Sequence, residues 1–79
     1  MKPVRTAVIG TGHLGRIHAR LAAESPHVEL VAVVDVSADA RDRVAAEVGT
    51  RGVADYRELK GQIEAAIVAT PTVHHYRVV

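Results

Sequence analysis

The feature that most constrains this chain is the stretch Gly10-Thr11-Gly12-His13-Leu14-Gly15, which holds three glycines in six residues. An apolar run, Ala7-Val8-Ile9, leads into it. An amphipathic helical pattern leaves it, with apolar residues recurring on one face at Leu14, Ile17, Leu21 and Ala22. The stretch therefore predicts a strand that ends in a tight turn and passes directly into a helix.

Each glycine of this turn has its own mechanical reason. Gly10 permits the sharp exit from the strand, because a residue without Cβ reaches backbone angles closed to others. Gly12 leaves room for a pyrophosphate to lie against the backbone, and Gly15 lets the helix pack close to the sheet. The N–H groups at the helix start, near His13 and Leu14, are free to face an anion, and the helix dipole adds attraction.

An acidic residue follows at the distance that a dinucleotide site requires. The apolar run 28–34 predicts a second strand, which ends on Asp35, 20 residues after Gly15. A carboxylate there can accept hydrogen bonds from both hydroxyl groups of an adenosine ribose. A glycine turn alone also occurs without a ligand, but here strand, turn, helix, second strand and acid coincide. This order of elements predicts NAD binding. NADP is disfavoured because the carboxylate of Asp35 would repel its 2′-phosphate. Arg41 and Arg43, on the next helix, weaken that preference.

The rest of the chain extends the same alternation of strands and helices. We expect helices at 13–24 and 38–48, a short strand at 52–54, a helical turn at 55–59, a strand at 63–69 and a further helix from Thr72. Ser37 is the expected cap of the second helix and Gly49 its terminator. Asp55-Tyr56-Arg57-Glu58 has the spacing of a capping box, which predicts that Asp55 caps the helical turn. The sequence predicts an α/β fold, a Rossmann-type doubly wound parallel sheet with strand order 3-2-1-4. We expect this sheet to be incomplete, lacking a fifth and a sixth strand.

Composition limits the classes of function. The net charge of +1 gives no electrostatic case for nucleic acid or an anionic membrane. The chain has no cysteine, which excludes disulfides, thiolate catalysis and Cys-ligated zinc. No apolar run approaches the length of a membrane span. The five histidines have no zinc-site spacing with supporting carboxylates, so no metal site is expected. We expect a cytoplasmic protein.

Three stretches together resemble the amino-terminal domain of the glucose–fructose oxidoreductase / inositol dehydrogenase family (Gfo/Idh/MocA). They are residues 7–18, residues 31–35 and the run Ala69-Thr70-Pro71-Thr72-Val73-His74-His75. The resemblance implies NAD(P)-dependent hydride transfer at a hydroxyl or carbonyl of a sugar, cyclitol or sugar derivative. It also implies a set of cofactor-binding residues: Gly10, Gly12, His13, Leu14, Gly15, Asp35, Thr70, Pro71 and His75.

The resemblance also implies parts that these 79 residues do not contain. Family members carry a Glu-Lys-Pro motif and a large substrate-binding domain, neither of which is present. We therefore expect residues 1–79 to be the amino-terminal part of a dinucleotide-binding domain, and we assign no catalytic residue. The expected partner is a sugar or polyol substrate, and the full-length protein is expected to be a homo-oligomer. Two alternatives stay open: a non-catalytic NAD(H)-sensing module, and the nucleotide domain of an amino-acid-pathway dehydrogenase.

Overall fold

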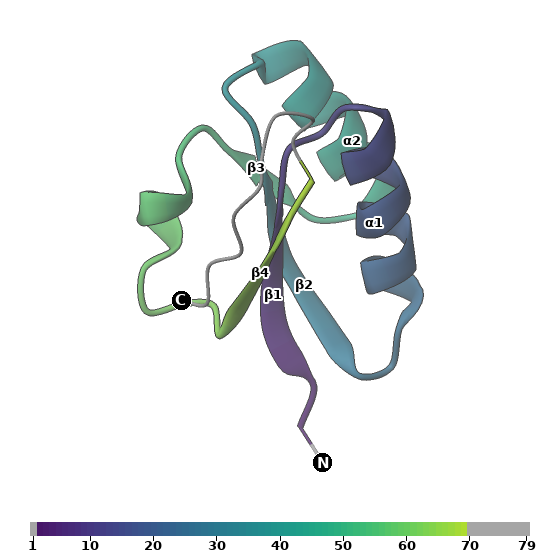
Figure 1. The fold of residues 1–79 in the computed structure, drawn as a ribbon, viewed down its shortest axis with the longest axis vertical. Coiled ribbons are helices and arrows are strands. Elements are labelled where there is room, and N and C mark those ends of the chain that lie inside the picture. Colours follow the sequence, from purple (N-terminus) through teal and green to yellow (C-terminus); the bar gives the residue numbers. More distant parts are fainter. Residues whose placement is uncertain (1, 70–79) are drawn as a thin grey trace.

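A computed structural model describes residues 2–69 of the chain. In chain order the elements are β1 (Val4–Ile9), α1 (His13–Glu24), β2 (Val28–Val34), α2 (Ala38–Val48), β3 (Arg51–Val53), the 3₁₀ helix η1 (Tyr56–Leu59) and β4 (Ala65–Val68) (Figure 1). All strand pairs are parallel and the sheet order is β3-β2-β1-β4. The predicted order 3-2-1-4 is therefore confirmed, with β3 starting one residue earlier and β4 two residues later than expected.

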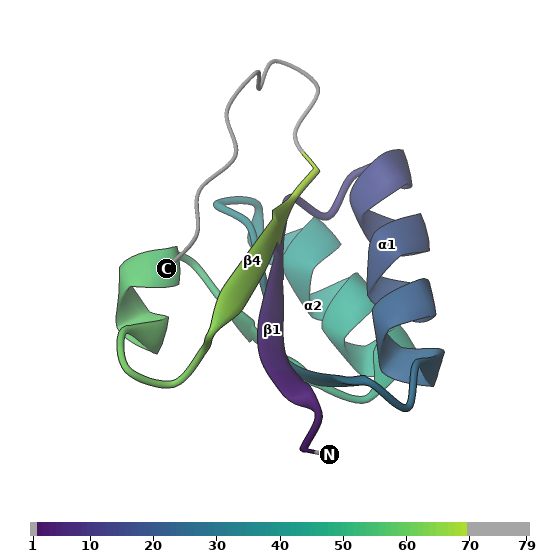
Figure 2. The ribbon, with the colours of Figure 1, turned by 60° about the horizontal axis from the view of Figure 1, so that its bottom comes forward.

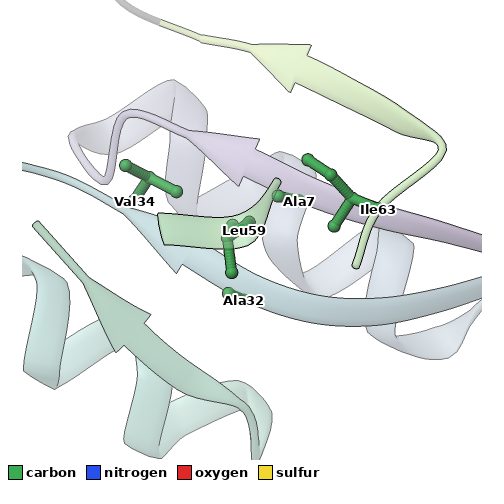
Figure 3. Packing of buried hydrophobic residues seen from close by; sticks show 5 residues of the cluster. All are labelled: Ala7, Ala32, Val34, Leu59 and Ile63. Carbon is green, nitrogen blue, oxygen red and sulfur yellow. The ribbon is translucent and has the colours of Figure 1, made fainter. Parts of the chain in front are cut away.

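The sheet is the middle of three layers. Helices α1 and α2 cover one face and η1 lies against the other, as two views of the ribbon agree (Figures 1 and 2). Because side chains alternate between faces along a strand, neighbouring residues of β1 belong to different cores. Val8 packs with Val33 and the helices, whereas Ala7 packs with Leu59 of η1 (Figure 3).

Helix α1 lies against the sheet through its smallest residues. Its buried residues are Gly15, Ala19 and Ala22. The larger apolar residues of the predicted stripe are exposed instead, Leu14 by 52%, Ile17 by 41% and Leu21 by 60%. A Cβ added to Gly15 would lie 1.8 Å from the carbonyl oxygen of Gly10. The helix is thus too close to the turn to accept large side chains on this face.

The helix ends follow the predicted capping residues. The Ser37 hydroxyl accepts a hydrogen bond from the N–H of Ala40, and Gly49 ends α2 in the left-handed conformation at φ 76°. At η1, Asp55 and Glu58 form a reciprocal capping box. These local signals fix where each helix begins and ends. The caps at Ser37 and Asp55 lie in the loops at the carboxyl edge of the sheet, whereas Gly49 lies in the loop that leads into the start of β3.

Strand β2 changes register in its middle. Thr6 of β1 pairs with Leu30, but the next residue, Ala7, pairs with Ala32, so Val31 has no partner in β1. The hydroxyl of Thr50 lies 3.1 Å from the Leu30 carbonyl oxygen and 2.9 Å from that of Val31. A side chain from the α2–β3 connection therefore bonds the backbone where the pairing is interrupted.

A candidate dinucleotide site

An open pocket of about 320 Å³ lies at the carboxyl ends of β1, β2 and β3. It is lined by Ile9, Gly10, Val34, Asp35, Val36, Ala54, Asp55 and Tyr56. In open parallel sheets, ligands bind outside the carboxyl ends of the strands, which is where this pocket lies. Val36 is 90% exposed and Tyr56 41% exposed, so two apolar side chains of the pocket wall face outward.

The three glycines of the turn have different structural needs. Gly10 has φ 101°, which a residue with a side chain rarely adopts, and its N–H bonds the Val34 carbonyl oxygen at 2.7 Å. Gly15 is needed for the close approach of α1 described above. Gly12 has φ −70° and ψ −166°, extended backbone open to any residue, and an added Cβ would meet nothing within 4 Å. Neither backbone nor packing within residues 2–69 requires glycine at position 12.

The start of α1 has the charge and hydrogen-bonding character of an anion site. Gly12 is its N-cap residue and gives no side-chain cap, and no acidic residue occupies the first turn. By contrast, Ser37 caps α2, and Asp39 lies in the first turn of that helix. His13 and Leu14, the first residues of α1, are exposed. The first N–H groups of a helix have no acceptor within the helix, so those of α1 are available to a phosphate.

The carboxylate of Asp35 is held by three neutral donors. Its Oδ2 accepts hydrogen bonds from the Thr11 N–H and from the Thr11 hydroxyl, each at 2.8 Å. Its Oδ1 accepts one from the Ser37 N–H at 2.9 Å. The glycine turn and the cap of α2 therefore both fix the position of this side chain at the pocket wall.

These contacts also determine the charge of Asp35. Burial alone would raise its pKa, but the hydrogen bonds from Ser37 and Thr11, with a smaller contribution from the backbone N–H of Val36, outweigh burial, and the net pKa is lowered. Asp35 is consequently an anion near neutral pH. An ionised carboxylate can accept hydrogen bonds from hydroxyl groups and repels another anion.

The two arginines that weakened the preference for NAD lie in different surroundings. The Arg41 side chain packs over Gly52, where an added Cβ would be 2.6 Å from Arg41 Cγ. Its Nη1 donates to the backbone carbonyl of Asp35 at 3.3 Å and its Nε lies 3.4 Å from an Asp42 oxygen. Arg43 lines a separate hollow between the glycine turn and α2. Neither arginine donates to the Asp35 carboxylate.

The structure brings most of the predicted site residues to one edge of the sheet. Gly10, Gly12, His13, Leu14 and Gly15 form the turn and the start of α1, and Asp35 faces them from the end of β2. Thr70, Pro71 and His75 lie outside the described residues.

The sequence did not predict three residues that lie at this site: Thr11, which bonds Asp35, and Val36 and Tyr56, which line the pocket. A hydroxyl residue between the two glycines was the available signal for Thr11. For Val36 the signal was an apolar residue directly after the acid. Tyr56 had no signal, because the pocket joins it to Asp35 only through the fold.

Two further expectations concern metals and membranes. Over residues 2–69, no group of three or more His, Cys, Asp or Glu side chains is placed to hold a metal ion. No helix in this described part of the chain has the length and apolar character of a membrane span.

Two characterised proteins resemble this chain in sequence over most of its length. The chain is 39% identical over 75 residues to UDP-N-acetylglucosamine 3-dehydrogenase of Acidithiobacillus ferrooxidans, covering 95% of this chain and 23% of that protein. It is 32% identical over 73 residues to inositol 2-dehydrogenase of Rhizobium meliloti, covering 91% and 22%. The chain thus spans less than a quarter of the length of these relatives.

Solved structures agree with the sequence relatives. Scyllo-inositol dehydrogenase from Lactobacillus casei, with bound NAD(H) and scyllo-inositol, superimposes with a TM-score of 0.80 at 27% identity, covering 94% of this chain and 23% of that one. GenD2 from gentamicin A biosynthesis, in complex with NAD, gives a TM-score of 0.85 at 28% identity, covering 95% and 22%.

The same family accounts for nearly all of the chain. Residues 4–79 match the family model GFO_IDH_MocA, described as an oxidoreductase family with an NAD-binding Rossmann fold. The resemblance to this family is therefore confirmed over nearly the whole chain. This chain belongs to the Gfo/Idh/MocA oxidoreductase family, and residues 2–69 form its Rossmann-type sheet with the glycine turn and the acid at one edge.

Proposed function

We propose that this chain binds NAD(H) through the adenosine and pyrophosphate half of the cofactor, as part of an oxidoreductase. The observation that carries the proposal is Gly12. A glycine that neither its backbone angles nor its neighbours require leaves a space beside the start of α1. A pyrophosphate lying against the backbone would fill that space and accept hydrogen bonds from the free N–H groups at the start of the helix.

The pocket at the strand ends suits the adenosine. The Asp35 carboxylate would accept the ribose hydroxyls, and the apolar surfaces of Val36 and Tyr56 would lie against the adenine ring. Support comes from the pocket lining and from the lowered pKa of Asp35, which keeps the acceptor ionised. Thr70, Pro71 and His75 are proposed for the nicotinamide side from the family resemblance alone.

We propose that the reaction is hydride transfer at a hydroxyl or carbonyl of a sugar, cyclitol or sugar derivative. The nicotinamide supplies the hydride chemistry when bound, and this chain binds and orients the cofactor. Support comes from relatives that are dehydrogenases of inositols and of UDP-N-acetylglucosamine. These relatives give no support to the sensing module or to the amino-acid-pathway dehydrogenase. The homo-oligomer and the cytoplasmic location stay predictions.

The protein is expected to prefer NADH over NADPH. A 2′-phosphate would lie a few ångströms from the ionised Asp35, a repulsion on the order of 1–3 kcal/mol at a partly wet site. This corresponds to roughly ten- to a hundredfold in affinity. Calorimetric titration with each cofactor measures it, and Asp35→Ala, which removes the charge, should bring the two affinities together. NADPH binding as tight as NADH in the unaltered protein would contradict the role of Asp35.

The 79-residue chain by itself is expected to bind cofactor only weakly and to show no turnover. Its relatives are about four times as long, since the matched residues cover only 22–24% of each. We therefore propose that the residues that bind substrate and transfer its proton lie outside these 79 positions. The assay is NADH formation over a panel of inositols and sugars, with binding of NADH by the same sample as the control. Turnover by this chain would place the catalytic groups among its own residues.

A further inference from the structure

Thr11 occupies a position of the glycine turn that the dinucleotide motif leaves open to any residue, yet its side chain is buried. It is 5% exposed, and within residues 2–69 only Thr6 is a comparably buried polar residue. The Thr11 hydroxyl donates to Asp35 Oδ2 at 2.8 Å, beside the backbone N–H of the same residue. Any residue except proline could supply the N–H at position 11, but only a hydroxyl residue places a second donor beside it.

The surroundings of Asp35 make this second donor matter. The carboxylate lines the pocket, and the charged group that approaches it from α2, Arg41, bonds its backbone carbonyl rather than its carboxylate. From the β3–η1 connection, Asp55 lines the same pocket and is bonded to Arg57. The carboxylate is therefore oriented by neutral donors, which hold its position without cancelling its negative charge.

We propose that the Thr11 hydroxyl is a positioning group that determines cofactor specificity, by holding Asp35 in the conformation that accepts a ribose diol. The inference rests on the proposed function of the pocket. A carboxylate with two donors on Oδ2 and one on Oδ1 is fixed before the ligand arrives. With the hydroxyl lost, Asp35 can turn away from the pocket, which weakens ribose binding and relieves repulsion of a 2′-phosphate.

The test uses adenosine-side probes, because these need only the described part of the site. ADP-ribose and 2′-phospho-ADP-ribose are titrated by calorimetry into the wild-type chain, Thr11→Val and Thr11→Ser. We expect Thr11→Val to weaken ADP-ribose binding by about tenfold, the usual effect of one hydrogen bond to a charged group. The preference for ADP-ribose over its 2′-phosphate should shrink, and Thr11→Ser should restore both values.

The pH dependence of binding gives a readout that a purely structural role would not move. The Thr11 hydroxyl is one of the donors that lower the pKa of Asp35. Losing it raises that pKa, so as the pH falls Thr11→Val should lose ADP-ribose binding at a higher pH than wild type. Thr6→Val is the matched control. The Thr6 hydroxyl is equally buried but donates to the Val4 carbonyl at 3.0 Å, away from the pocket. It should leave both selectivity and pH profile unchanged.

The outcomes distinguish the proposed cofactor binding from the positioning role of Thr11. A wild-type chain that binds neither probe overturns the proposed function, and the inference with it. Wild-type binding alongside unchanged selectivity in Thr11→Val overturns the inference alone. A Thr11→Ser variant that behaves like Thr11→Val also overturns it, because the methyl group and not the hydroxyl would then be what matters. If Thr11→Val does not fold, Thr11→Ala and Thr11→Ser give the same comparison.

Discussion

Gly12→Val is expected to abolish NADH binding while leaving the fold intact. The backbone at position 12 is in the extended region, which valine adopts readily, and its Cβ would enter open space. The same side chain would occupy the proposed path of the pyrophosphate. A clash of this kind costs about 3 kcal/mol or more, which is at least a hundredfold in affinity. Calorimetric titration gives the affinity, and circular dichroism on the same sample gives the fold.

The control for this variant is a glycine whose backbone conformation, unlike that of Gly12, favours glycine. Gly49 has φ 76° and lies at the end of α2, remote from the turn. Gly49→Ala should cost about 1 kcal/mol of stability through the left-handed backbone and should leave NADH affinity unchanged. Retention of wild-type affinity by Gly12→Val would show that the pyrophosphate does not lie beside Gly12.

Gly15→Ala adds a single methyl group, a smaller change than Gly12→Val, yet it is expected to remove the folded state. The added Cβ would lie 1.8 Å from the Gly10 carbonyl oxygen and 2.6 Å from its carbon, and both atoms belong to rigid backbone. Helix α1 would have to move away from the sheet, separating Ala19 and Ala22 from their contacts. The cost should exceed the roughly 1–3 kcal/mol of ordinary overpacking, which is a large part of the stability of so small a domain.

Thermal unfolding followed by circular dichroism measures this effect. Arg20→Ala, an exposed change on the same helix, is the control and should shift the melting temperature by a few degrees at most. A Gly15→Ala variant that melts near the wild-type temperature would mean that α1 is not held against Gly10.

The sequence predicted most of what is encoded locally. The caps at Ser37 and Asp55, the end of α2 at Gly49 and the strand order all follow from short patterns and from the handedness of crossovers. These features were predictable because each depends on a few neighbouring residues. The order of the strands needs only the additional rule that parallel connections are right-handed.

The features that sequence reasoning missed depend on distances between elements. An apolar stripe on α1 predicts an amphipathic helix, but it does not say which residues meet the sheet. The predicted stripe included both Ala22 and Leu14, but only Ala22 is buried, whereas Leu14 is 52% exposed. A Cβ added to Gly15 would lie 1.8 Å from the Gly10 carbonyl oxygen, and this close approach leaves no room for a large side chain between the helix and the sheet. Likewise, the role of Thr11 depends on Asp35, 24 residues away, lying within hydrogen-bonding distance. No local pattern contains that information.

The register change in β2 divides its pairing with β1 into two segments, residues 28–30 and 32–34. Leu30 packs on the same side as Val33, while Val31 and Ala32 both pack on the other, so the alternation of faces restarts at the unpaired residue. The segment that follows is paired without interruption up to Val34, directly before Asp35. We expect a one-residue insertion or deletion before Val31 to be accommodated at this unpaired residue. The same change after Val31 would move Asp35 beyond hydrogen-bonding distance of Thr11. We therefore expect the position of Asp35 to tolerate a change of length in the first segment of β2 but not in the second.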